Sequence, residues 1–176
     1  MENKRIDGDR IFLTPITYDD CEDFVRWRNS DFIQSKFIYR KEITVEQQRD
    51  WIKNKVETGE VVQFIIWDKA DNKKIGSVYL QHIDNDNKKC EFGILIGEEE
   101  YVGAGRGREA NLLICKYGFE VLGMHKIYLR VLAENERARK SYAKAGYTEE
   151  YTSHDDVWID DKPVDVIFMS KFKESM

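Results

Sequence analysis

Three glycines alternate with other residues in the stretch Tyr101-Val102-Gly103-Ala104-Gly105-Arg106-Gly107. Residues 90–96, just before it, have the pattern of a strand, and apolar residues recur at helical spacing after it, up to Gly123. Glycine allows the backbone to approach a ligand closely and to adopt dihedral angles that side chains forbid. A helix that begins here would direct unpaired amides and its positive dipole end at one point. The stretch is therefore either a tight turn or a cradle for a pyrophosphate.

The glycine spacing argues against two common nucleotide-binding motifs. A dinucleotide-binding fingerprint requires Gly-x-Gly-x-x-Gly and an acidic residue at the end of the next strand. Here the spacing is Gly-x-Gly-x-Gly, and the next predicted strand, residues 126–131, has no acidic residue at its end before Glu134. A nucleoside-triphosphate loop would need Gly-Lys-Ser or Gly-Lys-Thr, which the sequence lacks.

A second segment, residues 135–147, follows that strand and has the pattern of a short helix ended by Gly146. Together the two segments resemble the signature motifs of the GNAT superfamily of acetyl-CoA-dependent N-acetyltransferases. Residues 102–107 match the family loop Gln/Arg-x-x-Gly-x-Gly/Ala, except that Val102 stands in the place of Gln or Arg. Residues 135–147 match Asn-x-x-Ala-x-x-x-Tyr-x-x-x-Gly-Phe, with Tyr147 in the place of Phe. The resemblance covers most of the chain.

The resemblance implies that acetyl-CoA binds as a co-substrate. The cofactor contacts that it implies are Ile96, Val102, Gly103, Ala104, Gly105, Arg106, Gly107, Asn135 and Arg139. Backbone amides would do most of the holding, so the departure at Val102 matters little. Asn135 is also a good N-cap for the short helix, and one residue can do both jobs.

Two residues are candidates for the chemistry of acetyl transfer. Tyr142 lies where the family places the general acid, and a phenol with a pKa of about 10 could protonate the departing CoA thiolate. Its alternative role is packing in the core. Glu91 is the candidate base, because strand alternation places it on the face opposite Phe92, beside the bare backbone of Gly93. An ordinary surface charge on a half-exposed strand is the alternative for Glu91.

The N-terminal half is expected to shape the acceptor site, with Trp27, Arg28 and Asn29 as its substrate-binding residues. This run, with Trp51, looks like the branch that acetylates amino groups on nucleotide-linked sugars. Residues 125–129 and the Tyr142 segment look equally like spermidine and ribosomal-protein N-terminal acetyltransferases. The acceptor is therefore an amino sugar, a polyamine or a protein N-terminus. Packing of the tryptophans in a helix–helix core, and a catalytically silent acyl-CoA-binding or sensory domain, are the competing interpretations.

Pattern along the chain predicts a strand, two helices, three strands, a helix, a strand, a helix and two strands, which together indicate a mixed α/β fold. The GNAT resemblance implies an α/β fold of the α+β type. In it, a mostly antiparallel sheet of about seven strands is flanked by helices and splayed at the acetyl-CoA site. Residues 1–176 are expected to form a single N-acetyltransferase domain.

Composition indicates a compact cytoplasmic enzyme. Hydrophobic residues make up 41% of the chain and charged residues 35%, without an apolar span long enough for a membrane helix or a signal peptide. The three cysteines are far apart, which offers neither a disulfide framework nor a metal site. A net charge of -5 argues against nucleic acid and suits a cationic substrate. We therefore expect no nucleic acid and no membrane as partners, and a homodimer is left open.

Overall fold

The computed structural model describes residues 5–175 of the 176-residue chain. Its strands are β1 Ile6–Asp7, β2 Ile11–Pro15, β3 Val62–Asp68, β4 Lys73–Asp84, β5 Lys89–Ile96, β6 Lys126–Leu132, β7 Thr148–Ile159 and β8 Lys162–Phe172. Its α-helices are α1 Cys21–Arg28, α2 Asp31–Gln34, α3 Val45–Trp51, α4 Arg106–Glu120 and α5 Glu136–Lys144. A π-helical turn, Ile52–Val56, continues α3, and short 3-10 turns span Tyr18–Asp20, Glu99–Tyr101 and Lys173–Ser175.

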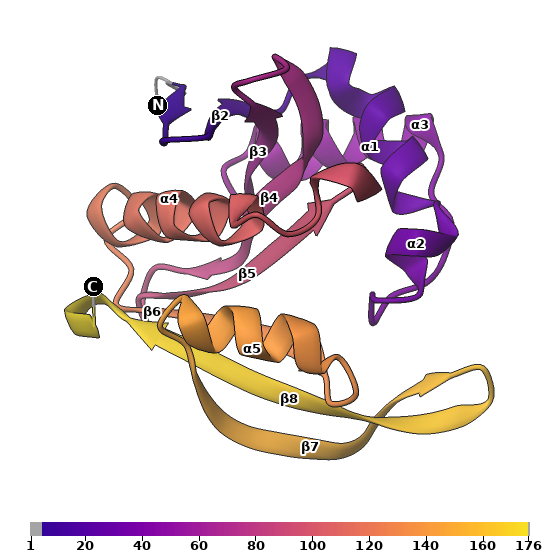
Figure 1. Cartoon of the computed structure of the whole chain (residues 1–176). Coiled ribbons are helices and arrows are strands. Elements are labelled where there is room, and N and C mark those ends of the chain that lie inside the picture. Colours follow the sequence, from indigo (N-terminus) through magenta and orange to yellow (C-terminus); the bar gives the residue numbers. More distant parts are fainter. Residues whose placement is uncertain (1–4, 176) are drawn as a thin grey trace.

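All eight strands belong to one sheet with the order β1-β2-β3-β4-β5-β6-β8-β7 (Figure 1). Neighbouring strands are antiparallel except β5 and β6, which are parallel. The mixed, mostly antiparallel sheet expected from the sequence is thus confirmed. The expectation of about seven strands missed β1, because two residues are too short to show an alternation of apolar and polar side chains.

The parallel pair β5–β6 separates soon after it begins. Residues 89–91 of β5 pair with residues 126–128 of β6, and no register is formed beyond Glu91. On its other edge, β6 pairs with β8 along its whole length, residues 126–132. The splay that the family resemblance implies is therefore present. In the described part of the chain, residues 92–96 of β5 have no strand partner on the β6 side, and α4 and α5 lie on either side of the diverging strands (Figure 1).

Side chains from alternate positions of the sheet pack in two clusters on opposite faces. In β3, Phe64 and Ile66 belong to the cluster beneath α4, whereas Ile65 belongs to the cluster formed with α1 and α3. This alternation follows from the two-residue period of a strand. The sheet is thereby covered on both faces around β3 to β5, whereas β7 is largely exposed, and the glycine loop lies at the start of α4.

Capping residues fix where the helices begin. Thr44 caps α3 through a capping box with Gln47, as a Thr followed three residues later by Gln predicts. Ser30 caps the short helix α2, a third α-helix where the sequence pattern predicts two between the first two strands. Four residues are too few to show helical periodicity. None of the helices within residues 5–175 is long and apolar enough to cross a membrane.

Candidate active site

The glycine loop approaches α4 in a left-handed conformation. Gly103, Ala104 and Gly105 have φ angles of 104°, 46° and 84°, and Gly105 is the N-cap of α4. Glycine adopts such angles without steric cost, which explains the residues at 103 and 105. Among residues 5–175, no side chain accepts a hydrogen bond from the first amides of α4. These amides and the helix dipole therefore offer a binding site for an anion.

Two arginines hold the loop from outside. The Arg10 guanidinium donates a hydrogen bond to the carbonyl oxygen of Ala104, and Arg106 Nε donates to the buried carboxylate of Asp68. Burial alone would raise the pKa of Asp68, but the hydrogen bonds from Arg106 and from the amides of Asp71 and Ala70 bring it below its ordinary value. The Arg106 side chain is thus anchored through Nε to Asp68 of β3.

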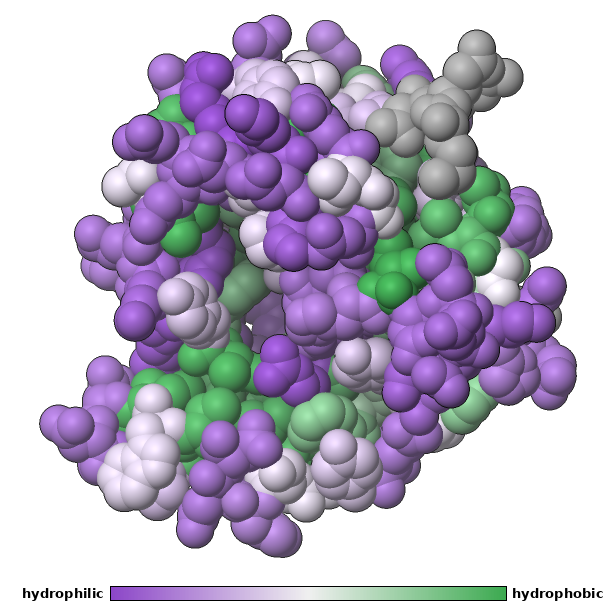
Figure 2. All heavy atoms as spheres, turned by 180° about the vertical axis from the view of Figure 1, so that it is seen from behind, coloured by the Kyte–Doolittle hydropathy of each residue, from purple (hydrophilic) through white to green (hydrophobic). Residues whose placement is uncertain are grey.

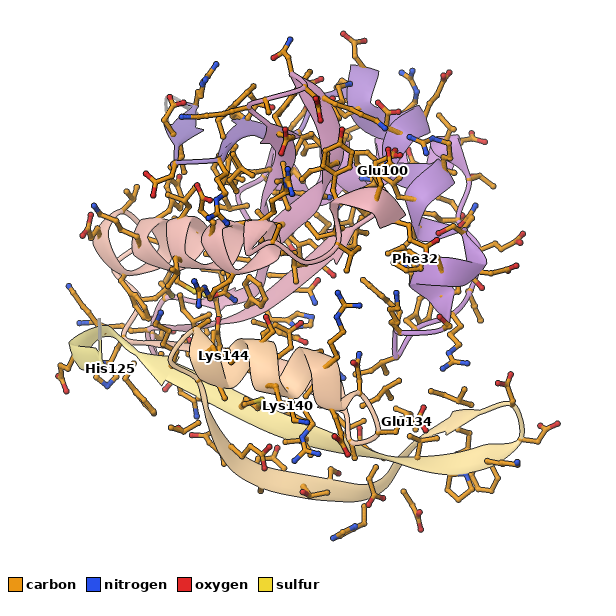
Figure 3. All side chains as sticks on the ribbon, viewed as in Figure 1. Phe32, Glu100, His125, Glu134, Lys140 and Lys144 are labelled. Carbon is orange, nitrogen blue, oxygen red and sulfur yellow. The ribbon has the colours of Figure 1, made fainter. Side chains whose placement is uncertain are left out.

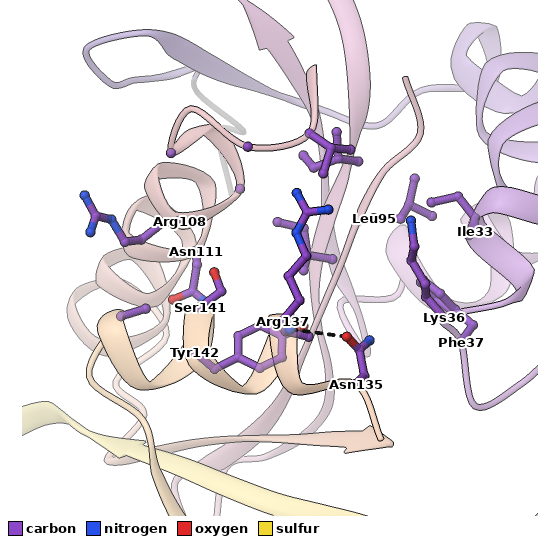
Figure 4. A pocket seen from close by; sticks show the side chains of 18 of the residues that line it. Ile33, Lys36, Phe37, Leu95, Arg108, Asn111, Asn135, Arg137, Ser141 and Tyr142 are labelled. Atoms are coloured by element: carbon purple, nitrogen blue, oxygen red, sulfur yellow. Dashed lines mark hydrogen bonds between the residues drawn. The ribbon is translucent and has the colours of Figure 1, made fainter. Parts of the chain in front are cut away.

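A cavity of about 300 Å³, here called the loop pocket, extends from the glycine loop along β5 to α5 (Figure 4). Most of the residues predicted to bind the cofactor come together here: Ile96, Val102, Gly103, Gly105, Gly107 and Asn135. Asn135 Oδ1 accepts a hydrogen bond from the Ala138 amide at 3.2 Å, so this residue caps α5 while it lines the pocket. The loop pocket therefore has an amide-rich end and an apolar wall beside the unpaired edge of β5.

Tyr142 lies at the inner end of the loop pocket (Figure 4). Its ring packs edge-on against Phe92, with centroids 6.0 Å apart. Burial raises its pKa further above the ordinary value, so the hydroxyl is protonated at neutral pH. Within residues 5–175, no group forms a hydrogen bond with this hydroxyl. The Tyr142 side chain packs in the core and also lines a cavity, so a packing role and a role as general acid are compatible.

Basic side chains surround the outer opening beside the glycine loop, here called the basic mouth. Its cations are Arg10, Arg108, Arg137, Lys140 and Lys144, and its one carboxylate is Glu136. Lys140 and Lys144 extend from neighbouring turns of α5 (Figure 3). Ala104 lines this opening rather than the loop pocket. The mouth is suited to phosphate groups. The sequence pattern does not reveal it, because its cations come from three separate segments.

A second cavity, of about 320 Å³ and here called the strand pocket, meets the loop pocket at Tyr142. It lies among β4, β5, β6 and the segment after α2, and both Glu91 and its neighbour Phe92 line it. Glu91 is not a surface charge, since its side chain is 7% exposed. Its two oxygens lie 3.0 Å from Arg130 Nε and 2.7 Å from His82 Nδ1. The carboxylate is thus held between two basic groups.

Gly93 allows the side chain of Tyr79 to lie across β5 in the strand pocket. A Cβ atom at position 93 would lie 2.3 Å from the Tyr79 ring, which is far closer than packing allows. Burial raises the pKa of Tyr79 to about 12. Its hydroxyl is therefore a neutral polar group at the wall of the pocket. Neither Tyr79 nor His82 was identified from the sequence. His82 lies in an irregularity of the β4–β5 register between Gln81 and Asp84, where its φ angle is 50°.

Of the three predicted substrate-binding residues, only Arg28 lines a described pocket. Trp27 is 1% exposed, packs in the core formed by α1 and α3, and donates a hydrogen bond to Glu98 at 2.7 Å. Asn29 is bonded through its amide to both backbone groups of Ile43. The core interpretation of Trp27 therefore agrees with its position. Glu98, just before the glycine loop, is its partly buried hydrogen-bond acceptor.

Arg139 faces away from the loop pocket. Its guanidinium pairs with Glu149 at 2.8 Å and donates to the carbonyl oxygen of Ala133 at 3.1 Å. It therefore joins α5 to β7, a contact that sequence spacing does not reveal. Among residues 5–175, no group of three or more His, Cys, Asp or Glu side chains is arranged to hold a metal ion.

Comparison with known proteins places this architecture in a family. The sequence profile described as "Acetyltransferase (GNAT) domain" matches residues 10–148. An uncharacterized protein of Methanocaldococcus jannaschii is 30% identical over 89% of this chain and 32% of its own length. Spermidine N(1)-acetyltransferase of Escherichia coli is 33% identical over 68% of this chain and 55% of its own length. The chain thus spans about half the length, or less, of these two relatives.

A solved structure shows the same fold. Spermidine N-acetyltransferase from Vibrio cholerae, crystallised in complex with CoA and spermine, superimposes with a TM-score of 0.88 at 24% identity. The superposition covers 96% of this chain and 98% of that one. The profile match extends over the glycine loop, β5, α5 and most of the sheet. The chain therefore belongs to the family of acetyltransferase (GNAT) domains.

Proposed function

We propose that this protein is an N-acetyltransferase that moves the acetyl group of acetyl-CoA directly to a primary amine. The observation that carries this proposal is the continuous path from the basic mouth, past the uncapped amides of α4, to the Tyr142 hydroxyl. The pyrophosphate of acetyl-CoA would bind the amides of Gly103–Gly107, with the outer phosphates near the basic mouth. The pantetheine arm would follow the unpaired edge of β5, beside Ile96 and Asn135.

In the proposed reaction, the amine nitrogen attacks the thioester carbonyl in the strand pocket. A C–N bond forms, the C–S bond breaks, and the amine loses a proton. Tyr142 would give its hydroxyl proton to the departing thiolate, since it is protonated and has no hydrogen-bond partner among residues 5–175. Glu91 is the proposed base, with water carrying the proton, because it lines the pocket that the amine would enter. To act as a base, the Glu91 carboxylate must take up a proton while it is paired with Arg130.

The acceptor is proposed to be a small amine, an amino sugar or a polyamine, or a protein N-terminus. The Tyr142 side chain, together with an open strand pocket, favours an active enzyme over a silent acyl-CoA-binding domain, which would need no acceptor cavity. The three cysteines are free and buried, and we propose a cytoplasmic location for the enzyme. Homodimer formation is a prediction to be tested by measurements in solution.

The proposal is tested by thiol release. Purified protein is mixed with acetyl-CoA and each member of an amine panel, and free CoA thiol is followed with a chromogenic disulfide. We expect thiol release to depend on an amine and to yield its N-acetyl product, detected by mass spectrometry. Thermal stabilisation by acetyl-CoA but not by NAD would support the cofactor assignment. Equal stabilisation by both, with no amine-dependent thiol release, would contradict it.

A further inference from the structure

We infer that the acceptor amine also carries an anionic group, a phosphate or a carboxylate, and that Arg28 and Lys36 receive this group in the strand pocket. The inference rests on the proposed acetyl transfer and narrows its acceptor. It is drawn from the charges that line the strand pocket. These charges differ in sign from the net charge of the chain, which is -5.

Positive side chains outnumber negative ones in the strand pocket. Its cations are Arg28, Lys36 and Arg130, and its one carboxylate is Glu91. Glu91 already contacts Arg130 at 3.0 Å and His82 at 2.7 Å. Thus the carboxylate that could attract an ammonium group is neutralised, while two cations remain. A polycation would meet repulsion here, whereas an anionic group would be attracted.

Arg28 is a buried cation without a counterion. The residue is 7% exposed, and its Nη2 donates to the carbonyl oxygen of Tyr39. Its Nη1 is buried and has no hydrogen-bond partner, and no carboxylate of residues 5–175 lies within 4.0 Å of the guanidinium. The rings of Phe37 and Tyr39 lie 4.7 and 5.9 Å away and hold the group in place. A buried charge without compensation is costly, so a bound anion would stabilise this arrangement.

Lys36 supplies the second cation, on the same side of the site. It lines both the loop pocket and the strand pocket, and it projects toward the cavity beside Phe37 (Figure 4). Its Nζ lies 3.0 Å from the centroid of the Phe32 ring, and it forms no ion pair with any residue of the described range. Because the two pockets meet at Tyr142, an anion held here leaves the amine of the same molecule close to the thioester.

The test compares amines that differ in one anionic group. Glucosamine 6-phosphate is paired with glucosamine, and L-alanine with L-alaninamide, so that the two pairs separate a phosphate from a carboxylate. Spermidine is the polycationic competitor. We expect kcat/KM to be at least about tenfold higher for the anionic member of one pair. Fastest turnover of spermidine, or equal turnover within both pairs, would overturn the inference.

Variants locate the charge preference in the strand pocket. Arg28→Met and Lys36→Gln should each bring the ratio within the preferred pair toward one, while Arg28→Lys should retain part of it. Lys41→Gln is the matched control, because Lys41 is an exposed cation nearby that lines none of the three pockets. It should leave the ratio unchanged. A ratio unaffected by both Arg28→Met and Lys36→Gln would contradict the assignment.

Binding measurements can test this inference independently of the proposed function. Calorimetric titration of glucosamine 6-phosphate and of L-alanine into the CoA-saturated protein requires no turnover. If no amine releases thiol, the transferase proposal fails, yet binding that weakens at least about tenfold in Lys36→Gln still supports the anion site. Absence of binding by both anionic amines, together with active transfer to neutral or cationic amines, would reject the anion site alone.

Discussion

Replacing Tyr142 by Phe removes the proposed general acid and little else. The ring would keep its edge-on contact with Phe92, and the hydroxyl forms no hydrogen bond within residues 5–175. We therefore expect the free energy of unfolding to change by less than about 0.5 kcal/mol. The thiolate that the hydroxyl would protonate exists only as the C–S bond breaks. The loss should thus appear in kcat, by roughly 10²-fold or about 2.7 kcal/mol of barrier, with the affinity for acetyl-CoA nearly unchanged.

The assay is steady-state thiol release across pH, with calorimetry for acetyl-CoA. Because burial raises the pKa of Tyr142, the hydroxyl keeps its proton above the pH at which an ordinary tyrosine, with a pKa of about 10, loses it. Wild-type kcat should therefore show no loss from this group at mildly alkaline pH. Tyr117→Phe is the control, because it removes a hydroxyl from α4 outside the three pockets. Full turnover of Tyr142→Phe at every pH would leave Tyr142 as a packing residue.

Three further predictions concern the glycine loop, the proposed base and the cysteine thiols. Gly105→Val should raise the Kd of acetyl-CoA by about tenfold or more, since a side chain would obstruct the amides of α4. Gly59→Val, at a φ of 81° against 84°, imposes similar backbone strain far from the loop, so equal affinities in the two variants would reject the cradle. Glu91→Gln should move the rise of kcat/KM to higher pH, and an unchanged profile would leave this residue as the partner of Arg130 alone. Burial raises the pKa of Cys90 to about 12 and of Cys115 to about 11, so both should stay protonated and unreactive toward the chromogenic disulfide at about pH 8 until the protein unfolds.

Local pattern was sufficient for most of the fold. Alternation placed β5 at residues 90–96 and β6 at residues 126–131, within one residue of their observed bounds, and the capping signals of Thr44 and Asn135 marked two helix starts. These features depend on neighbours in the sequence, which is why they can be read from it. The strand β1 and the helix α2 are too short to show a period. The splay between β5 and β6 was inferred from the family resemblance.

Side-chain direction and local charge could not be read in the same way. Arg106 and Arg139 stand in motif positions, yet their guanidinium groups pair with Asp68 and Glu149. The net charge suggested a cationic substrate, whereas Arg28 and Lys36 make the strand pocket positive. Net charge sums over the whole surface, but a pocket responds to the few charges that the fold brings to its wall.

A crystal structure of the protein with CoA bound would be the sharpest test of the proposed acetyl transfer. We expect the pyrophosphate within hydrogen-bond distance of the amides of Gly103–Gly107, the pantetheine arm along residues 92–96 of β5, and the sulfur beside the Tyr142 hydroxyl. The opening to the strand pocket should remain free for an amine. A pyrophosphate bound elsewhere, or a sulfur that ends away from both Tyr142 and the strand pocket, would contradict the proposed transfer.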